Sequence, residues 1–256
     1  MEKLDGKLAE IRDYWNDYIT DIRLAKSPVG TKEFFDELDT YRFGRSGYLL
    51  PIVEARNLKG KRLLDIGCGV ALELVQFAKA GAIVTGIDLC ARPIELAKKN
   101  FAHNGVDGNL LVMNGEGLQF EDNSFDYVYS RMPLQYTESP DKMVAELYRV
   151  LRKGGVATLI VFNRYSWLNL AAKLSGENLL HQRAPVFNLY SAKEFGKLLS
   201  CFKELAITTE RLPTKTTGYP GFFVSMYNHL FVPAVKLVPE TMLKSIGAHI
   251  VARAVK

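Results

Sequence analysis

The sequence predicts an α/β domain with a largely parallel sheet. From residue 62 onward, short apolar runs of strand length alternate with longer segments of helical periodicity. The short runs are apolar throughout, which is typical of parallel strands that helices cover on both faces. Glycine-containing turns at residues 81, 107–108 and 154–155 separate the units. With 256 residues, 48% of them hydrophobic, the chain can bury one large core or a core plus a cap.

The alternation predicts seven strands and four helices in chain order. Strands are expected near residues 62–66, 82–88, 109–113, 125–130, 155–162, 203–211 and 247–254. Helices are expected near residues 71–80, 92–103, 140–151 and 191–202. Ser191 and Glu194, three residues apart at the start of the last helix, predict a capping box.

The segments outside the alternation predict a cap and two insertions. Residues 1–60 are polar and aromatic and are expected to form an N-terminal helical cap on a main domain that spans residues 61–256. Residues 163–189 and 212–246 interrupt the alternation. Each is long enough to be an inserted lid rather than a simple connection.

Charge and cysteine usage limit the classes of function. The net charge is +5, and residues 211–256 hold six basic residues against one acidic residue. Because this excess lies in one short and otherwise apolar segment, no nucleic-acid partner is expected. The three cysteines have neither metal-ligand spacing nor an even count, so we interpret them as reduced thiols of a cytoplasmic protein and expect no metal site. Neither a signal peptide nor a membrane span is expected.

A glycine turn between the first strand and the first helix predicts a ligand site. Gly67 and Gly69 allow a tight turn and a close approach of the backbone to a ligand, although a plain strand-to-helix turn is the alternative. Asp88, at the end of the next strand, is placed to accept hydrogen bonds from the two hydroxyls of a ribose. A dinucleotide site would have a third glycine at Leu72, and Asp65 would repel a diphosphate. A ligand with an ammonium or sulfonium charge, such as S-adenosylmethionine (SAM), fits better than a nicotinamide dinucleotide.

Four motifs in order resemble those of the class I SAM-dependent methyltransferases. They are DIGCG (65–69), GIDLC (86–90), NGEGLQFEDNSFDYVYS (114–130) and ELYRVLRKGG (146–155). The chain is most similar to the broad small-molecule subgroup that includes quinone-biosynthesis and natural-product methyltransferases. The resemblance implies a Rossmann-like seven-stranded sheet in which the seventh strand, within GAHIVARAVK (247–256), is antiparallel and lies between the fifth and sixth strands.

The resemblance also implies roles for the residues of the motifs. Asp65, Gly67 and Gly69 would hold the methionine part of SAM. Asp88 would hold the ribose, Leu89 would pack on the adenine, and Ser130 would lie beside the sulfonium. The adenine pocket would be completed by Asn114, Gly115 and Glu116.

The chain departs from the family pattern in several positions. Val70-Ala71 replaces the common Thr-Gly, Asn114 the usual Asp, Gln119 the usual Pro, and Arg152-Lys153 the usual Lys-Pro. After the fourth strand, Leu134-Gln135-Tyr136-Thr137 replaces Leu-His-His-Thr, so no histidine base is expected there.

Methyl transfer from a sulfonium is an in-line displacement that mainly needs alignment and exclusion of water. A base is needed only where the acceptor must lose a proton. Tyr136, His181 and Tyr14 are the candidate catalytic residues, with Tyr41 a further candidate, and packing is the alternative for each tyrosine. Arg42 and Arg131 would neutralise an acidic substrate, with surface solvation as the alternative.

The second insertion is the clearest clue to the acceptor. Its segment GYPGFFVSMYNHLFVPAVKLVP (218–239) is apolar and aromatic, with basic flanks. We expect either a lid over a hydrophobic acceptor pocket or an interfacial element that rests on an anionic membrane and collects a lipid-soluble acceptor. Packing on the sheet edge or a homodimer contact is the alternative.

The sequence therefore predicts a SAM-dependent methyltransferase of a small, apolar or aromatic acceptor. Two alternatives stay open: an RNA or protein methyltransferase, and a non-catalytic adenosine-binding scaffold. Against the first, the chain has no Asn/Asp-Pro-Pro-aromatic signature after the fourth strand, where it reads Ser130-Arg131-Met132-Pro133.

Overall fold

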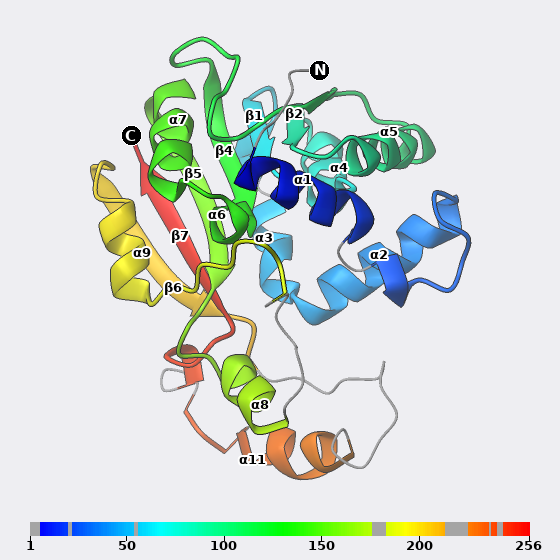
Figure 1. The fold of residues 1–256 in the computed structure, drawn as a ribbon, viewed down its shortest axis with the longest axis vertical. Coiled ribbons are helices and arrows are strands. Elements are labelled where there is room, and N and C mark those ends of the chain that lie inside the picture. Colours follow the sequence, from blue (N-terminus) through cyan, green and yellow to red (C-terminus); the bar gives the residue numbers. More distant parts are fainter. Residues whose placement is uncertain are drawn as a thin grey trace.

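A seven-stranded sheet forms the centre of the molecule (Figure 1). The computed structural model describes residues 6–19, 22–53, 56–175, 183–212, 225–235, 237–239 and 243–256. The strands lie in the order β3-β2-β1-β4-β5-β7-β6. Their bounds are β1 Arg62–Ile66, β2 Ile83–Asp88, β3 Asn109–Val112, β4 Phe125–Arg131, β5 Leu151–Phe162, β6 Glu204–Glu210 and β7 His249–Val255.

The directions of the strands confirm the predicted topology. Strands β1 to β5 pair in parallel, and β7 pairs antiparallel with both β5 and β6. His249, the first residue of β7, lies opposite Phe162 of β5 and Glu210 of β6, so β7 begins at the edge where the parallel strands end. The fifth strand begins at Leu151 rather than near residue 155, because Leu151 pairs with Phe125 ahead of a register shift.

Helices cover both faces of the sheet, as predicted. One face packs against α7 (Pro140–Val150) and α9 (Ala192–Leu198). The other packs against α4 (Leu72–Lys79) and α5 (Ala91–Asn104). The predicted capping box starts α9: the Glu194 N–H donates to the Ser191 hydroxyl at 3.2 Å, and the Ser191 N–H donates to the Glu194 carboxylate at 2.8 Å.

The chain before β1 is helical and reaches the carboxyl edge of the sheet. Its elements are α1 (Lys7–Asp17), η1 (Ile22–Leu24), α2 (Lys32–Arg45), η2 (Gly47–Leu49), α3 (Leu50–Val53) and η3 (Arg56–Leu58). α1 lies across the carboxyl end of β2 (Figure 1), where the Arg92 N–H donates to Asn16 Oδ1 at 3.3 Å and the Cys90 thiol lies 3.3 Å from the carbonyl of Arg12. α2 packs against α4 and α5.

The two insertions are described in part. The first contains α8 (Trp167–Ser175), and its residues 176–182 lie outside the described part. The second contains the π-helix η4 (Tyr227–Phe231) and α11 (Val232–Val235), while residues 213–224, 236 and 240–242 lie outside. Among the described residues, no helix is long and apolar enough to cross a membrane. The second insertion nevertheless exposes large apolar side chains, namely Met226, Leu230, Phe231, Leu237, Val238 and Ile246.

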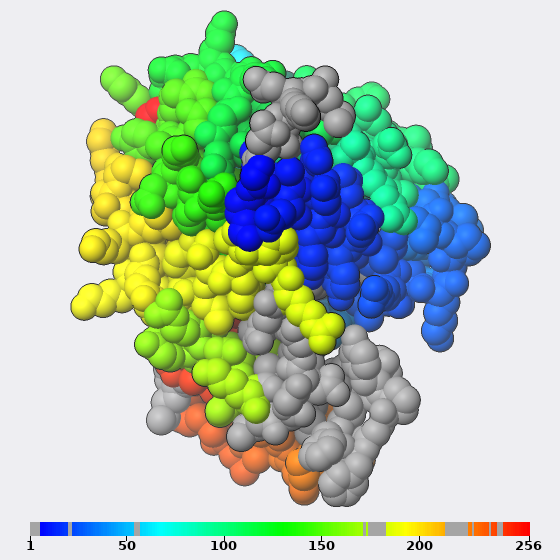
Figure 2. All heavy atoms as spheres, viewed as in Figure 1, coloured from blue at the N-terminus to red at the C-terminus, as the bar shows by residue number. Residues whose placement is uncertain are grey.

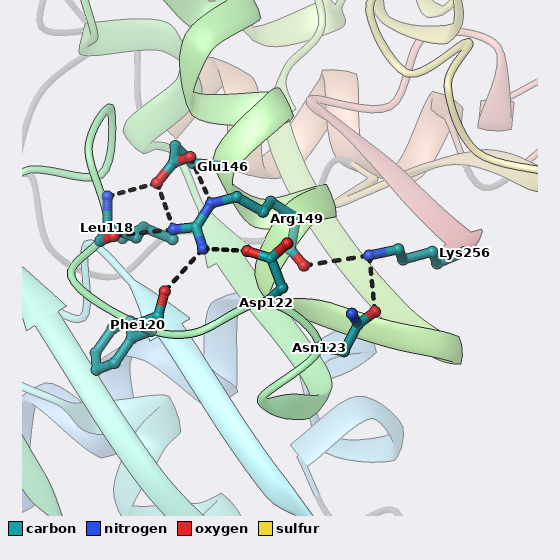
Figure 3. A network of polar contacts seen from close by, with 7 residues as sticks. All are labelled: Leu118, Phe120, Asp122, Asn123, Glu146, Arg149 and Lys256. Carbon is teal, nitrogen blue, oxygen red and sulfur yellow. Dashed lines mark hydrogen bonds and ion pairs between the residues drawn. The ribbon is translucent and has the colours of Figure 1, made fainter.

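A network around Arg149 fixes the opposite edge of the sheet, where β4 begins and β7 ends (Figure 3). All five N–H groups of the Arg149 guanidinium are used. They donate to both carboxylate oxygens of Glu146, to Asp122, and to the carbonyls of Leu118 and Phe120, at 2.8–2.9 Å. We call these residues, with Asn123 and Lys256, the Arg149 clamp; it ties the loop before β4 to α7 and to the end of the chain.

Candidate active site

The strand order reverses between β1 and β4, and ligands of open parallel sheets bind outside the strand ends at such a point. The glycine turn lies there. Gly67 has a φ of +74°, and a Cβ on it would lie 2.1 Å from the Pro133 side chain, so no other residue fits. Gly69 has a φ of +56°, and a Cβ on it would meet no atom within 4 Å. The first glycine therefore closes the turn, and the second leaves open space in which a ligand can approach the backbone.

Asp88 lies beside this open space. Its carboxylate accepts hydrogen bonds from the N–H of Gly69 at 3.1 Å and of Cys90 at 2.9 Å. Burial raises the pKa of Asp88, while these two backbone N–H groups oppose the rise. The carboxylate keeps further lone pairs for the two hydroxyls of a ribose. Leu89, the next residue, is half-buried at the same strand end.

Asp65 places a buried acidic side chain at this end of the site. Its side chain is buried, and burial together with the negative charges of Glu73 and Asp88 holds its pKa well above the ordinary value. A cationic ligand beside Asp65 would favour its ionised form. These features together fit two parts of SAM. The buried acid Asp65 and the open backbone at Gly69 fit the methionine part, and the Asp88 carboxylate, a hydrogen-bond acceptor, fits the ribose.

The predicted adenine-pocket residues lie at the carboxyl end of β3. Asn114 Oδ1 accepts a hydrogen bond from the Glu116 N–H at 3.0 Å, so its second lone pair remains for a ligand. A Cβ on Gly115 would lie 2.7 Å from Met143 and 2.9 Å from Ile66, which shows that this turn packs closely on the core.

Glu116 and Ser130 have structural partners. The Glu116 carboxylate accepts hydrogen bonds from the Thr137 hydroxyl and, at 3.0 Å, from the Ser139 N–H, which ties the turn after β3 to the segment after β4. The buried Ser130 hydroxyl donates to the carbonyl of Ile66 at 3.1 Å. Its side chain therefore joins β4 to β1 at the switch point.

Tyr14 and Tyr136 belong to one aromatic cluster. The Tyr136 ring lies between Trp15, at 4.6 Å, and Phe187, at 5.7 Å between ring centroids, and Trp15 in turn contacts Tyr14 at 5.0 Å. On the face shown in Figure 2, α1 lies beside the segment that begins at residue 183, which agrees with these contacts. Burial raises the pKa of both tyrosines, so both are neutral phenols at neutral pH. His181 lies outside the described residues.

Sequence reasoning missed a polar cluster between the sheet and the N-terminal helices. Arg42 donates to Glu73 at 2.6 Å, and Arg131 Nε lies 3.6 Å from the same carboxylate oxygen. Although burial raises the pKa of Glu73, Arg42 and Arg131 together hold it below its ordinary value. Arg45 donates to the hydroxyl of Tyr41 and lies over its ring at 5.4 Å, which gives Tyr41 a structural contact.

The same cluster contains a buried histidine. His249 is fully buried, with Nδ1 at the Tyr48 hydroxyl and Nε2 accepting from Arg211 at 3.1 Å. Arg42 and Arg131 were noted from the sequence as candidates for an acidic substrate. The other members come from distant parts of the chain, and no local spacing signals that they meet.

Comparisons with known proteins agree with this geometry. Residues 64–159 match the family described as "Methyltransferase domain". The chain is 34% identical over 107 residues to the sterol 4-C-methyltransferase strm-1 of Caenorhabditis elegans, covering 40% of this chain and 32% of that protein. It is 32% identical over 130 residues to the ubiquinone biosynthesis O-methyltransferase of Pseudomonas entomophila, covering 50% and 56%. The chain thus spans about half or less of the length of these curated relatives.

Solved structures share the fold. Magnesium protoporphyrin IX methyltransferase of Synechocystis with bound SAM has a TM-score of 0.61 at 17% identity and covers 100% of both chains. A SAM-dependent methyltransferase of Aquifex aeolicus has a TM-score of 0.57 at 15% identity, covering 86% of this chain and 95% of that one.

Proposed function

We propose that this chain, whose residues 64–159 match the methyltransferase-domain family, transfers a methyl group from SAM to a small apolar or aromatic acceptor. The observation that carries this proposal is the arrangement at the switch point of the sheet. There Gly69 leaves its backbone open, Asp88 has lone pairs free for a ribose, and Asp65 is a buried acid whose ionised form a cationic ligand would favour. The non-catalytic scaffold becomes an outcome of the experiment below, whereas a nucleic-acid or protein methyltransferase would use the same cofactor and differ in its acceptor.

Each of these residues has a defined task in holding SAM. Asp65 and the backbone at Gly67 and Gly69 would hold the methionine part, Asp88 the ribose, and Leu89 with the turn at residues 114–116 the adenine. SAM supplies a methyl group on a sulfonium whose leaving group is already good, so the chain mainly has to align the acceptor and exclude water.

We propose that the aromatic cluster of Trp15, Tyr136 and Phe187 packs against the acceptor and excludes water. Because burial keeps Tyr136 and Tyr14 protonated, they would orient the acceptor through a hydrogen bond rather than remove a proton as phenolates. His181 remains a candidate base from the first insertion. An apolar or aromatic acceptor agrees with the names of the relatives, which refer to a sterol and to ubiquinone biosynthesis.

We also propose that residues 1–60 act as a cap on the domain of residues 61–256, and that residues 212–246 give a cytoplasmic protein a peripheral membrane contact. The side chains of Leu230 and Leu237 are 66% and 88% exposed, which supports the second point. Sedimentation with anionic vesicles tests it. Leu230→Glu with Leu237→Glu should abolish binding, and equal binding by this variant would rule the contact out.

Calorimetric titration of S-adenosylhomocysteine tests the main proposal. We expect micromolar binding that weakens at least tenfold in Asp88→Ala, about 1.4 kcal/mol. Asp107→Ala, an exposed aspartate in the turn before β3, is the matched control and should bind like the unsubstituted chain. No binding by the unsubstituted chain would refute the proposal. Binding without methyl transfer to any phenol, thiol or quinol would favour the scaffold.

A further inference from the structure

We propose that the acceptor carries an acidic group, a carboxylate or a phosphate, and that the polar cluster between the sheet and α2 receives it. We call this group the arginine cluster: Arg42, Arg45, Tyr48, Glu73, Tyr129, Arg131, Arg211 and His249. The inference rests on the proposed function, because it names the chemistry of the substrate for the same site.

The arginine cluster extends away from the cofactor residues. Arg131 ends β4, Arg211 follows the end of β6, and His249 begins β7, so all three lie at the carboxyl edge of the sheet. In the strand order, β4 is next to β1, and β7 is three strands from β1. At about 4.8 Å per strand, the strands that carry Arg131 and His249 lie roughly 5 Å and 14 Å from β1. Arg131 is thus the strand residue of the cluster nearest to the glycine turn.

Arg45 and Arg211 have no carboxylate in ion-pair contact within the described part of the chain. Glu73 instead bonds Arg42 directly, at 2.6 Å, and lies 3.6 Å from Arg131 Nε. The side chains of Arg45 and Arg211 donate to neutral groups: Arg45 to the Tyr41 hydroxyl, outside the cluster, and Arg211 to His249. Burying guanidinium groups without a counter-ion is costly. An anion would remove that cost.

The tautomer of His249 leaves the Tyr48 hydroxyl as a further hydrogen-bond donor. A guanidinium has no acceptor, so Arg211 must donate to Nε2 of His249. Burial and the surrounding arginines hold the pKa of His249 well below its ordinary value, so the ring is neutral and its one proton lies on Nδ1. That proton is donated to the Tyr48 oxygen. The Tyr48 hydroxyl proton is therefore left to donate to another group.

Two more donors in the cluster lack a hydrogen-bond partner. Among the described residues, Arg131 Nε and the Tyr129 hydroxyl are buried without a hydrogen-bond partner. The Tyr129 side chain is 1% exposed, and the charged groups that act on it are those of Glu73, Arg131 and Asp65. Nearly all buried polar groups find a partner. Unpartnered donors beside an excess of arginines are what a carboxylate or phosphate oxygen would satisfy.

Two of the arginines lie at or next to a residue in the left-handed backbone conformation. Met132, directly after Arg131, has a φ of +81°, and Arg211 itself has a φ of +61°. The Arg211 carbonyl is held by the Trp167 indole N–H at 2.9 Å and the Ala248 N–H at 3.3 Å. Such strain in non-glycine residues costs about 1 kcal/mol or more and is common at binding sites.

Calorimetry on the complex saturated with S-adenosylhomocysteine tests the inference with three aromatic probes. They are 4-hydroxybenzoate, phenyl phosphate and the neutral 4-hydroxybenzyl alcohol. We expect at least one acid to bind ten times or more tightly than the alcohol, and the better acid identifies the group as carboxylate or phosphate. Equal binding of acids and alcohol, or binding of neither acid, would overturn the inference.

Substitutions distinguish an acceptor site from a cofactor site. Arg211→Gln should weaken the better acid at least tenfold and leave S-adenosylhomocysteine affinity within twofold, and Arg211→Lys should restore part of the loss. Arg152→Gln, an arginine paired with Asp126 near the start of β5, is the matched control. If Arg211→Gln does not fold by circular dichroism, Arg45→Gln replaces it.

The two proposals fail in different ways. Equal losses for the acid and for S-adenosylhomocysteine would assign the cluster to the carboxylate of the cofactor and overturn the inference. Failure of the unsubstituted chain to bind S-adenosylhomocysteine would refute the proposed function itself.

Discussion

The Arg149 clamp and the arginine cluster lie at opposite edges of the same sheet and use arginine in opposite ways. In the clamp, five N–H groups meet five oxygen acceptors, and the carboxylates of Glu146 and Asp122 raise the pKa of Arg149 (Figure 3). In the cluster, Arg131 Nε has no hydrogen-bond partner among the described residues, and burial with the charges of Arg45 and Arg131 lowers the pKa of Arg211 to about 10.

The difference distinguishes a region that stabilises the fold from a region that can bind a ligand. An arginine whose donors are all used stabilises the elements that it joins and has nothing left for a ligand. Arginines that share too little negative charge are held in place by the rest of the fold at a cost in free energy. The arginine cluster therefore has positive charge and hydrogen-bond donors that a ligand can use, whereas all five guanidinium donors of the Arg149 clamp are already used.

The largest expected contrast is in stability. Arg149→Gln should lower the free energy of unfolding by about 2–3 kcal/mol, because the carbonyls of Leu118 and Phe120 lose their donors and the Glu146 carboxylate keeps only the Leu118 N–H. Arg211→Gln should change it by less than about 1 kcal/mol, because it removes a buried cation that has no carboxylate of its own. Urea denaturation measures both, and similar losses would mean that both regions are scaffold.

The free energy of unfolding below pH 6.5 should depend on the protonation of His249. Its pKa in the folded chain lies well below the ordinary 6.5, so the unfolded chain binds this proton more readily. The stabilising contribution is present above pH 6.5 and is lost as the pH falls below it, at up to about 1.4 kcal/mol per pH unit. His249→Gln should remove this slope.

A bound acid should also make the His249 slope shallower, since an anion beside the ring raises the pKa of the imidazole. His103→Gln, on the exposed end of α5, serves as the control and should leave the slope intact. A slope unchanged in His249→Gln would contradict the neutral, proton-on-Nδ1 ring from which the spare Tyr48 donor follows.

A feature can be predicted from the sequence when the residues that form it are close together in the chain. The glycine turn, the capping box at Ser191 and the apolar strands are encoded within a few consecutive residues, and the structure confirms them. The arginine cluster joins residues 42, 73, 131, 211 and 249, which the pairing of β6 with β7 and the packing of α2 on α4 bring together. Arg211 and His249 each look like ordinary strand-end residues until β6 and β7 are paired.

The helix α8 illustrates the same limit in the fold. The sequence predicts an inserted lid at residues 163–189, because they interrupt the strand–helix alternation and are too long for a simple connection. In the structure the Ser166 hydroxyl accepts from the Asn169 N–H at 3.1 Å, and the Trp167 indole bonds the Arg211 carbonyl. One contact at the start of α8, that of Ser166, is thus local, whereas the other joins Trp167 to a residue 44 positions away in the chain.

The smallest expected effect tests whether the clamp serves stability alone. Lys256 donates to the Arg149 carbonyl and to Asn123 Oδ1, both at 3.1 Å, and its ammonium lies 4.7 Å from the centre of the Tyr148 ring. Lys256→Gln should lower the free energy of unfolding by about 0.5–1 kcal/mol, because these contacts are partly exposed. The affinities for S-adenosylhomocysteine and for the acid probes should not change.

Lys153→Gln is the matched control for Lys256, since Lys153 is an exposed neighbour. It should leave both stability and binding unchanged. A loss of acid binding in Lys256→Gln at full stability would show that charge at this edge acts on the far edge of the sheet. The Arg149 clamp could then no longer be assigned to stability alone and the arginine cluster to binding alone, because charges at both edges would contribute to the same electrostatic field.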